Sequence, residues 1–178
     1  MDNQNTIETE RLLLRKFASS DAEAMFFGWA NDPEVTKYMT WNPHENIDQT
    51  ASIIKRWVEE YENPKTFRFA ITLKAVGELI GSIDVVGYVD GAPEIGYCLS
   101  RKHWNNGYMS EALRAMLSFL VDKGFKRAVI EADERNIGSN RVITKCGFRF
   151  THQQYKEHCS AFKIEPITVN WYEIDLAR

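Results

Sequence analysis

The sequence predicts an α+β fold in a single domain that spans residues 1–178. Residues 67–99 contain three short apolar or alternating segments separated by turn signals, which predict an antiparallel meander. Residues 93–148 then alternate strand-like segments with helical periodicity, a pattern typical of strand–helix–strand crossovers. A chain of 178 residues is long enough to enclose one hydrophobic core.

The first third of the chain is predicted to be mainly helical after an opening strand at residues 11–17. A helix is expected at residues 22–30, behind the capping residues 19–21, and Pro33 follows its end. A second helix begins at Asn46 or Asp48 and ends near residue 62.

The meander consists of predicted strands at residues 67–73, 79–86 and 94–99. Asp90 and Gly91 form a turn signal that returns the chain into the third of these strands. After a short loop, the period changes to that of a helix at residues 107–123. Apolar residues at helical spacing form its buried side: Met109, Leu113, Met116, Leu117 and Leu120.

The start of that helix is a candidate phosphate site. Free backbone N–H groups and the helix dipole both favour an anion at a helix N-terminus. Gly107 has no Cβ, so its backbone can approach such a ligand closely. A plain crossover without a ligand would leave the same pattern.

The last third of the chain is predicted to contain three strands and one helix. The strands are expected at residues 128–132, 148–155 and 167–174, and the helix starts at Ser139 or Asn140 and is closed by Gly147.

Composition and charge exclude several classes of protein. A net charge of −3 does not predict a nucleic-acid-binding surface. No apolar run is long enough to span a bilayer, and the N-terminus does not resemble a signal peptide, so a cytoplasmic location is expected. Three cysteines are expected to be reduced thiols. His152, His158 and Cys159 fit no standard zinc spacing, and no metal site is predicted.

Two motifs together resemble the GCN5-related N-acetyltransferase (GNAT) family. The first is Trp-x-x-Gly-Tyr-x-x-Glu-Ala-Leu from Trp104, and the second is Asn-x-x-Ser-x5-Lys-x-Gly-Phe from Asn136. They are most similar to the branch that includes ribosomal-protein N-terminal acetyltransferases, and residues 9–15 look like the opening strand of that branch. The resemblance covers nearly the whole chain. It implies a mixed, mostly antiparallel sheet of about seven strands, splayed at a cofactor cleft and flanked by helices.

The resemblance also implies acetyl-coenzyme A (acetyl-CoA) as the cosubstrate and assigns residues to it. Backbone N–H groups would hold the diphosphate, in a loop that keeps only the glycine of the usual family pattern; Trp104 and Met109 replace its outer residues. These loop residues are Trp104, Asn105, Asn106, Gly107, Tyr108, Met109 and Ser110. The pantetheine arm and acetyl group would lie along Tyr97, Cys98 and Leu99, with the Leu99 N–H near the acetyl oxygen. Further contacts are assigned to Asn136, Ser139, Asn140 and Lys145.

Amine acetylation also requires a base for the amine and a proton for the departing thiolate. Glu94 matches a glutamate that serves as general base in several family members, while Glu131 is the competing candidate and Asp84 a weaker one. Ser139 matches the residue that the ribosomal branch uses as the acid, although it could also be a helix cap.

Other assignments of the acid and of the thiols remain open. Tyr155, Tyr108 or no dedicated acid at all are alternatives to Ser139. Cys98 as a nucleophile is disfavoured, because no histidine or lysine adjoins it in sequence and free cysteine more often packs in a core.

The resemblance predicts an N-acetyltransferase that acts on a primary amine. The acceptor is a protein N-terminal α-amine or a small molecule such as a polyamine, an amino acid or an antibiotic. The acceptor pocket is expected in the N-terminal part, around Trp29, Trp41 and Tyr38, whereas Trp57 is expected in the core. The alternatives are a non-catalytic coenzyme A-binding module and, with less support, a metal-dependent hydrolase. Monomer and homodimer are both compatible with the sequence.

Overall fold

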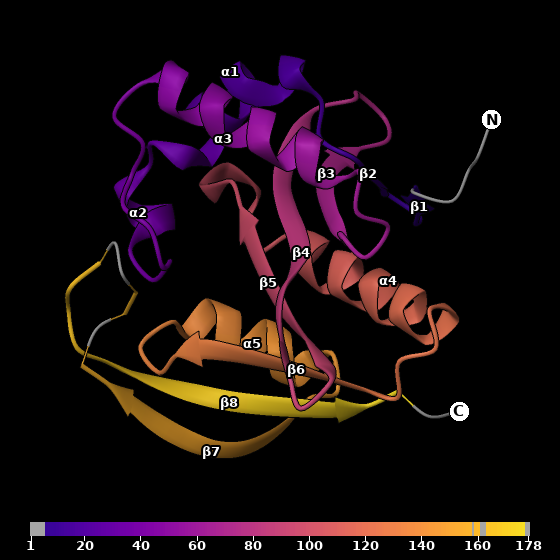
Figure 1. The fold of residues 1–178 in the computed structure, drawn as a ribbon, viewed down its shortest axis with the longest axis vertical. Helices are drawn as coiled ribbons and strands as arrows, with labels where there is room; N and C mark the ends of the chain where they lie inside the picture. The colour runs from indigo at the N-terminus through magenta and orange to yellow at the C-terminus, as the bar shows by residue number, and fades with distance from the viewer. Residues whose placement is uncertain (1–5, 158, 161–162, 177–178) are drawn as a thin grey trace.

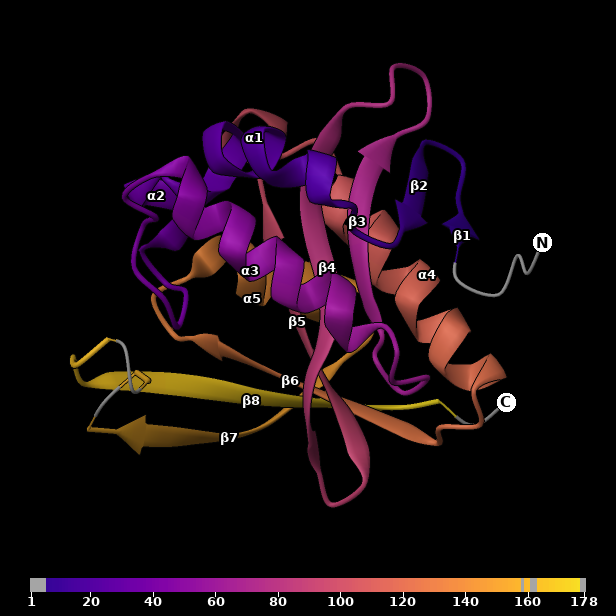
Figure 2. The same cartoon turned by 45° about the horizontal axis from the view of Figure 1, so that its top comes forward.

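The computed structural model describes residues 6–157, 159–160 and 163–176. It confirms the α+β class: one mixed, mostly antiparallel sheet is flanked by helices on both faces (Figures 1 and 2). The strands within the described residues are β1 (Ile7–Glu8), β2 (Leu12–Arg15), β3 (Arg68–Leu73), β4 (Leu79–Val89), β5 (Ala92–Leu99), β6 (Arg127–Asp133), β7 (Arg149–Lys156) and β8 (Ile167–Asp175). Their order in the sheet is β1-β2-β3-β4-β5-β6-β8-β7.

The hairpin between β4 and β5 confirms the predicted turn. Asp90 and Gly91 have φ values of 48° and 79°, which a tight hairpin turn of the type that matches strand twist requires. Strand β4 is longer than predicted: it continues past Val86 through a bulge between Val85 and Gly87 and pairs with β5 up to Val89.

The helices form two layers. They are α1 (Ala22–Met25), α2 (Pro33–Thr36), α3 (Ile47–Glu60), α4 (Tyr108–Asp122) and α5 (Ile137–Lys145). Helices α1 and α3 cover one face of the sheet, and α4 and α5 cover the other (Figure 2). Each layer encloses its own cluster of buried side chains, and the predicted apolar stripe of α4 lies in one of them.

Two helix predictions were wrong in detail. Residues 22–30 are not one regular helix, because α1 continues as a π-helical turn at Phe26–Ala30, where the N–H of Asn31 bonds the Phe26 carbonyl. Helix α5 begins at Ile137, before Ser139 and Asn140, because the side chain of Asn136 accepts a hydrogen bond from the Ser139 N–H and caps it. In contrast, Asn46 caps α3 as predicted.

The sheet separates between β5 and β6. These strands are parallel, and their only register pair among the described residues is Glu94 with Val129. Beyond it β5 runs with β1–β4, whereas β6, β8 and β7 run across them (Figure 1). The sheet is therefore splayed, with one half on each side of the gap.

Candidate active site

Two cavities meet where the sheet splays. The larger, of about 1050 Å³, is bounded by α3, by the loop that precedes it and by β4–β6, and we call it the acidic cavity. The smaller, of about 700 Å³, lies against the start of α4 and of α5, and we call it the basic cavity. They share wall residues from three segments: Tyr38, Met39, Tyr97, Cys98, Asn136 and Ser139. A molecule in one cavity can therefore reach a molecule in the other.

The loop before α4 presents a run of free backbone donors to the basic cavity. Asn105 and Gly107 both have left-handed backbone conformations, with φ values of 62° and 77°. Among the described residues, no N–H group from 105 to 110 donates a hydrogen bond to a protein acceptor. Such a cradle at a helix N-terminus suits phosphate oxygens.

Basic side chains line the rest of the basic cavity. They come from the end of α2, from the loop before α5 and from α5 itself: Lys37, Arg135, Arg141 and Lys145. Glu34 is the acidic residue among the lining residues. The excess of positive charge favours an anionic ligand with several phosphates.

Arg11 is a residue of this site that the sequence did not reveal. Its Nη1 donates to the carbonyl of Asn106 at 3.0 Å, its Nε donates to Glu111 at 2.7 Å, and its guanidinium lies 4.5 Å from the ring centroid of Tyr108. Arg11, in the turn between β1 and β2, thus fixes the loop before α4 although it lies 95 positions before Asn106 in the sequence. No local pattern in the sequence could show this contact.

The register of β5 decides which backbone groups face the gap. Ser100 N–H donates to the Ile80 carbonyl, so Ser100 and, by alternation, Cys98 turn their backbone groups toward β4. Tyr97 and Leu99 then turn theirs toward the gap left by β6. There the Leu99 carbonyl accepts the indole N–H of Trp104 at 2.8 Å.

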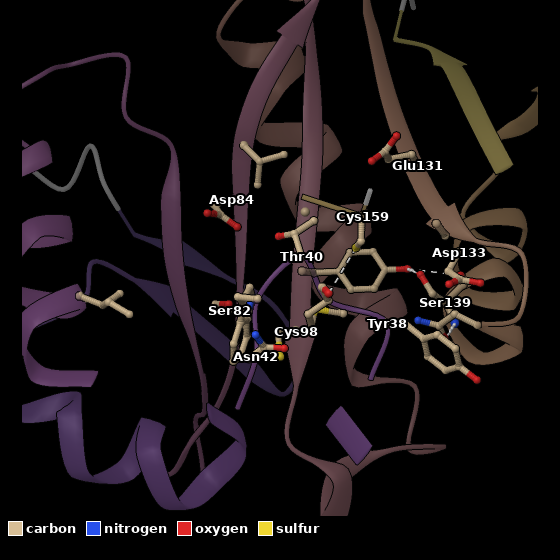
Figure 3. Close-up of a pocket in the computed structure, with 18 of the residues that line it drawn as sticks. Tyr38, Thr40, Asn42, Ser82, Asp84, Cys98, Glu131, Asp133, Ser139 and Cys159 are labelled. Atoms are coloured by element: carbon tan, nitrogen blue, oxygen red, sulfur yellow. Dashed lines mark hydrogen bonds between the residues drawn. The ribbon is translucent and has the colours of Figure 1, made fainter. Parts of the chain in front are cut away.

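The predicted polar residues near α5 have different surroundings. Ser139 lies on the shared wall, and its Oγ is 2.8 Å from the hydroxyl of Tyr97 (Figure 3). The Asn136 Oδ1 caps α5, while its Nδ2 has no partner among the described residues. Asn140 faces the other way, where its Oδ1 accepts from Tyr172 at 2.6 Å and from Asn170 at 3.0 Å.

Lys145 at the end of α5 and Asn106 in the loop before α4 differ in which of their groups a ligand can reach. Lys145 lines the basic cavity, and its Nζ makes no hydrogen bond within the described part of the chain. The side chain of Asn106 is turned back to the carbonyls of His103 and Trp104. Only the backbone of Asn106 is therefore available to a ligand.

Among the described residues, five acidic side chains line the acidic cavity: Glu45 in the loop before α3, and Asp84, Glu94, Glu131 and Asp133 on strands β4, β5 and β6. Asp133 is ion-paired with Arg135 at 2.6 Å. Figure 3 shows Asp84 and Glu131 at the cavity. Asp84 on β4 bonds Arg68 at 3.1 Å, and Glu131 on β6 bonds Lys156 at 2.5 Å. Glu94 on β5 makes no hydrogen bond or ion pair within the described residues and is partly buried. Burial and the nearby Glu131 raise the pKa of Glu94, against a smaller opposing effect of Lys156.

Cys98, the candidate nucleophile, and Tyr155 and Tyr108, the alternative proton donors, are less well placed for catalysis. Burial raises the pKa of Cys98 to about 12, so its thiol is not an activated nucleophile. Tyr155 is 66% exposed on the edge strand β7 and lines neither cavity. Tyr108 lines the basic cavity beneath the guanidinium of Arg11.

The aromatic residues of the N-terminal part divide between core and cavity. Trp41 and Tyr38 line the acidic cavity, as expected. Trp29 does not, because it is 1% exposed in the core. Trp57 packs against the core, as expected, with its ring centroid 5.0 Å from that of Phe17, and it also reaches the cavity wall.

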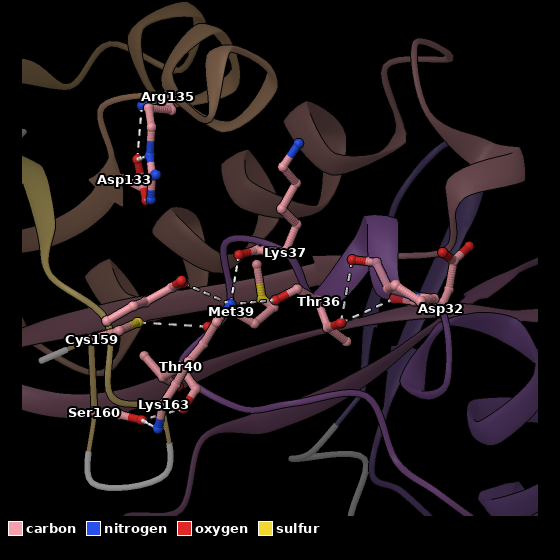
Figure 4. A network of polar contacts seen from close by, with 12 residues as sticks. Asp32, Thr36, Lys37, Met39, Thr40, Asp133, Arg135, Cys159, Ser160 and Lys163 are labelled. Carbon is pink, nitrogen blue, oxygen red and sulfur yellow. Dashed lines mark hydrogen bonds and ion pairs between the residues drawn. The ribbon is translucent and has the colours of Figure 1, made fainter.

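A polar network holds the walls of the cavities together. Lys163 Nζ donates to the carbonyls of Thr36 and Lys37, and the Cys159 thiol donates to the carbonyl of Met39 (Figure 4). The segment between β7 and β8 is thereby attached to the loop after α2. Both loops contribute lining residues to the acidic cavity.

No metal-type cluster and no membrane-type helix occur in the described part of the chain. No three His, Cys, Asp or Glu residues lie together in a way that could hold a metal ion, although His158 is outside the described residues. None of the described helices has the length and apolar character required to cross a membrane. All three cysteines are free thiols.

Comparison with known proteins identifies the family. The family model described as Acetyltransferase (GNAT) domain matches residues 11–149, which is most of the chain. The chain belongs to the GNAT acetyltransferase family. It is 36% identical over 148 residues to the uncharacterized N-acetyltransferase YoaA of Bacillus subtilis (strain 168), which covers 80% of this chain and 82% of that protein.

Solved GNAT structures have the same fold. A GNAT acetyltransferase from Bacillus anthracis is 28% identical, with a TM-score of 0.81 and coverage of 96% of this chain and 98% of that one. RimL, a ribosomal L7/L12 α-N-protein acetyltransferase in complex with coenzyme A, has a TM-score of 0.81 over 96% of this chain and 98% of its own. RimL is 19% identical to this chain, a likeness that shows the fold alone.

This GNAT protein is an N-acetyltransferase whose cosubstrate is acetyl-CoA. Its basic cavity fits that molecule, because the unpaired N–H groups of residues 105–110 and the surrounding cations suit a diphosphate and a further phosphate. Acetyl-CoA supplies the activated acetyl group. The protein has to hold it, to bind the amine and to move two protons.

Proposed function

We propose that this enzyme acetylates a primary amine bound in the acidic cavity, and that Glu94 is its general base. The observation that carries the proposal is the meeting of two cavities of opposite charge at the splay of β5 and β6. Phosphates favour the basic cavity, and a cationic amine favours the acidic one. The shared wall is where an acetyl group and an amine come together.

Glu94 is favoured over Glu131 and Asp84 because its carboxylate is not already paired. An ammonium group near neutral pH must lose a proton before it can attack a thioester. Burial raises the pKa of both Glu94 and Asp84, so the difference lies in their partners: Asp84 is held by Arg68 and Glu131 by Lys156, whereas the carboxylate of Glu94 is free to accept the proton.

Ser139 is proposed as the residue that returns a proton to the departing thiolate. Its hydroxyl stands at the shared wall and is bonded to the hydroxyl of Tyr97. Burial, foremost, raises the pKa of Tyr97, so that group stays protonated and holds the Ser139 hydroxyl in place by a hydrogen bond. Solvent then returns the proton that Ser139 gives up. The Tyr97 and Leu99 backbone and the Nδ2 of Asn136 are proposed to bind the pantetheine arm. Lys145 is proposed to bind a phosphate, and Asn140 to support α5 from behind.

The acceptor is proposed to be a protein or peptide N-terminal α-amine. The acidic cavity, of about 1050 Å³, is large enough for several residues of an extended peptide and opens beside α3. RimL, which has the same fold, is a protein N-terminal acetyltransferase by name. Small amines such as a polyamine, an amino acid or an antibiotic are the competing acceptors.

Turnover of acetyl-CoA with a peptide amide and with a simple alkylamine tests the proposal. Glu94→Gln keeps the side-chain shape and removes its basicity, so kcat should fall by about 10²–10⁴ at pH 7 with either amine. Binding of coenzyme A, measured by calorimetry, should be unchanged. The residual rate should rise with pH, because the free amine then forms without the carboxylate. If Glu94→Gln keeps nearly full kcat while Glu131→Gln loses it, the base is Glu131.

A further inference from the structure

His44 is a buried polar residue at the wall of the acidic cavity that the proposed chemistry does not use. It is 5% exposed, and it lies in the loop between α2 and α3. Its backbone N–H donates to the Ala30 carbonyl at 2.8 Å, and its ring lies 5.1 Å from that of Trp41. The imidazole is thus held in a fixed place beside the bound acceptor.

A single hydrogen bond determines which nitrogen of His44 carries the proton. The Thr50 hydroxyl lies 2.8 Å from His44 Nδ1, and Thr50 is 0% exposed. Other helical hydroxyls, such as those of Ser52 and Thr144, donate to a carbonyl four residues earlier, but Thr50 makes no such bond. A buried hydroxyl without an acceptor is destabilising, so Thr50 must donate to Nδ1. The ring proton is then on Nε2.

The Nε2–H of His44 faces the cavity. Among the described residues this group has no protein partner, and no fully buried side-chain nitrogen or oxygen there lacks one. Nε2 therefore has access to the open space that His44 lines. Burial lowers the pKa of His44, so the ring is a neutral donor near neutral pH.

The acidic cavity consequently has two different walls. Four of its carboxylates come from the strands, which is where the amine is expected, whereas the opposite wall carries one charge of each sign, on Glu45 and Arg56. His44 belongs to the wall formed by α3 and the loop before it, where the Ser52 proton is already used by the Asp48 carbonyl. A neutral donor at this position matches an uncharged oxygen and does not match a second ammonium group.

We infer that the His44 Nε2–H binds a carbonyl oxygen of the acceptor, so that the enzyme selects amines that carry a nearby amide, as a peptide N-terminus does, over simple alkylamines and polyamines. Thr50 is the positioning residue, since it sets the tautomer. The inference rests on the proposed function, because it assumes that the amine lies at the Glu94 side of the cavity. It adds a determinant of acceptor class.

The kinetic test compares alanyl-alanine amide with n-pentylamine in two variants. His44→Phe/Thr50→Val removes both polar partners together, so that no buried hydroxyl is left without an acceptor. In this variant the ratio of kcat/KM for the peptide amide to that for pentylamine should fall about tenfold, or ~1.4 kcal/mol. The fall should come from a higher KM for the peptide amide, with kcat little changed. His44→Gln carries an amide N–H near the position of Nε2 and should restore part of the ratio.

A second measurement is independent of turnover. Nitrogen-15 NMR of histidine-labelled protein should show His44 as the Nε2–H tautomer in the wild type, and Thr50→Val should change its shifts. An Nδ1–H tautomer in the wild type overturns the inference. An unchanged ratio in the double variant, or a wild type that acetylates pentylamine as efficiently as the peptide amide or does not acetylate the peptide amide, also overturns it. Glu94→Gln on pentylamine reports separately on the base, so the two proposals can fail independently.

Discussion

Glu94 and Glu131 carry the same functional group on neighbouring strands, but their surroundings differ. The partner of Glu131 is Lys156, and Glu94 has no partner among the described residues. The two carboxylates are also coupled, because the charge of Glu131 helps to raise the pKa of Glu94 and Lys156 opposes this. Substitutions of Glu131 or Lys156 should therefore change the pKa of Glu94 while its own side chain stays intact.

Glu131→Gln should shift the pH dependence of kcat. Removing the Glu131 charge and leaving Lys156 in place both lower the pKa of Glu94, so the acid limb of the kcat profile should move to lower pH. The matched variant Lys156→Gln should move the limb to higher pH. Profiles recorded with saturating peptide amide measure both shifts. If the acid limb moves in the same direction in Glu131→Gln and in Lys156→Gln, Glu94 is excluded as the titrating base.

At the scale of a single element, the start of α4 depends on backbone shape. Gly107 has a φ of 77°, which is strained for any residue with a Cβ. A Cβ at Gly107 would have the Arg11 guanidinium as its nearest neighbour, at an ordinary contact distance of 3.5 Å. The backbone conformation of the loop, more than crowding, therefore requires glycine here.

Gly107→Val should weaken coenzyme A binding at least about tenfold, or ~1.4 kcal/mol. The reason is that the donors of residues 105–110 would lose their common orientation. Calorimetry on folded protein measures this. Gly91→Val is the control, because Gly91 has a φ of 79° in the remote β4–β5 turn and should leave affinity unchanged. Equal affinities for wild type and Gly107→Val would argue against the loop as the phosphate site.

Helix α5 provides a prediction with two separable effects. Asn136→Ala should remove the cap of α5, lowering the free energy of unfolding by about 1 kcal/mol. It should also weaken acetyl-CoA binding by about 1 kcal/mol through loss of the Nδ2 donor. Asn136→Ser keeps a capping oxygen and should restore the stability but not the affinity. Thermal unfolding and calorimetry distinguish the two. Recovery of both by serine would mean that Asn136 acts through the cap alone.

Local signals predicted the elements well and their ends less well. The Asp90-Gly91 turn and the apolar stripe of α4 are set by neighbours in sequence, and both were predicted. The α5 cap was misplaced because Asn136, Ser139 and Asn140 are all good capping residues and only the folded chain selects one. The π-helical turn at Phe26–Ala30 has no distinct sequence pattern.

For the whole molecule, the N-terminal strands are attached to α4 by one carboxylate. Glu111 accepts hydrogen bonds from the Thr9 hydroxyl at 2.6 Å, the Arg11 N–H at 2.8 Å and the Arg11 Nε at 2.7 Å. Burial alone would raise the pKa of Glu111, but these bonds together hold it below the ordinary value. The same contacts position Arg11 so that it donates to the carbonyl of Asn106 in the loop before α4.

Glu111→Ala should lower the free energy of unfolding by about 2 kcal/mol at pH 7. Because the folded pKa of Glu111 is depressed, its contribution is fully present above the pKa of the unfolded chain and is lost as pH falls through the folded value. The difference between wild type and variant should thus shrink in acid. Denaturant titrations at several pH values measure it, with the exposed Glu10→Ala as control. A difference that is constant with pH would show that packing, not charge, is lost.

Contacts across the whole molecule are also where sequence reasoning reached its limit. The motifs around Trp104 and Asn136, together with the strand residues Tyr97 to Leu99, predicted about half of the residues that line the basic cavity. Arg11, and the His44–Thr50 pair with its defined tautomer, depend on contacts made only by the folded chain. The absence of a partner for Glu94 is likewise a property of three-dimensional structure.

The unpaired carboxylate of Glu94 has a consequence for the evolution of heat resistance. Its folded pKa is raised, so the folded state is penalised at pH values above that pKa, and the penalty disappears below the ordinary carboxyl pKa of about 4. Glu94→Gln should therefore melt at a higher temperature than the wild type at pH 7, and calorimetric scans should converge near pH 4. A higher melting temperature for the wild type at pH 7 would contradict this. Under the proposed mechanism, selection for thermostability alone would thus favour loss of the general base.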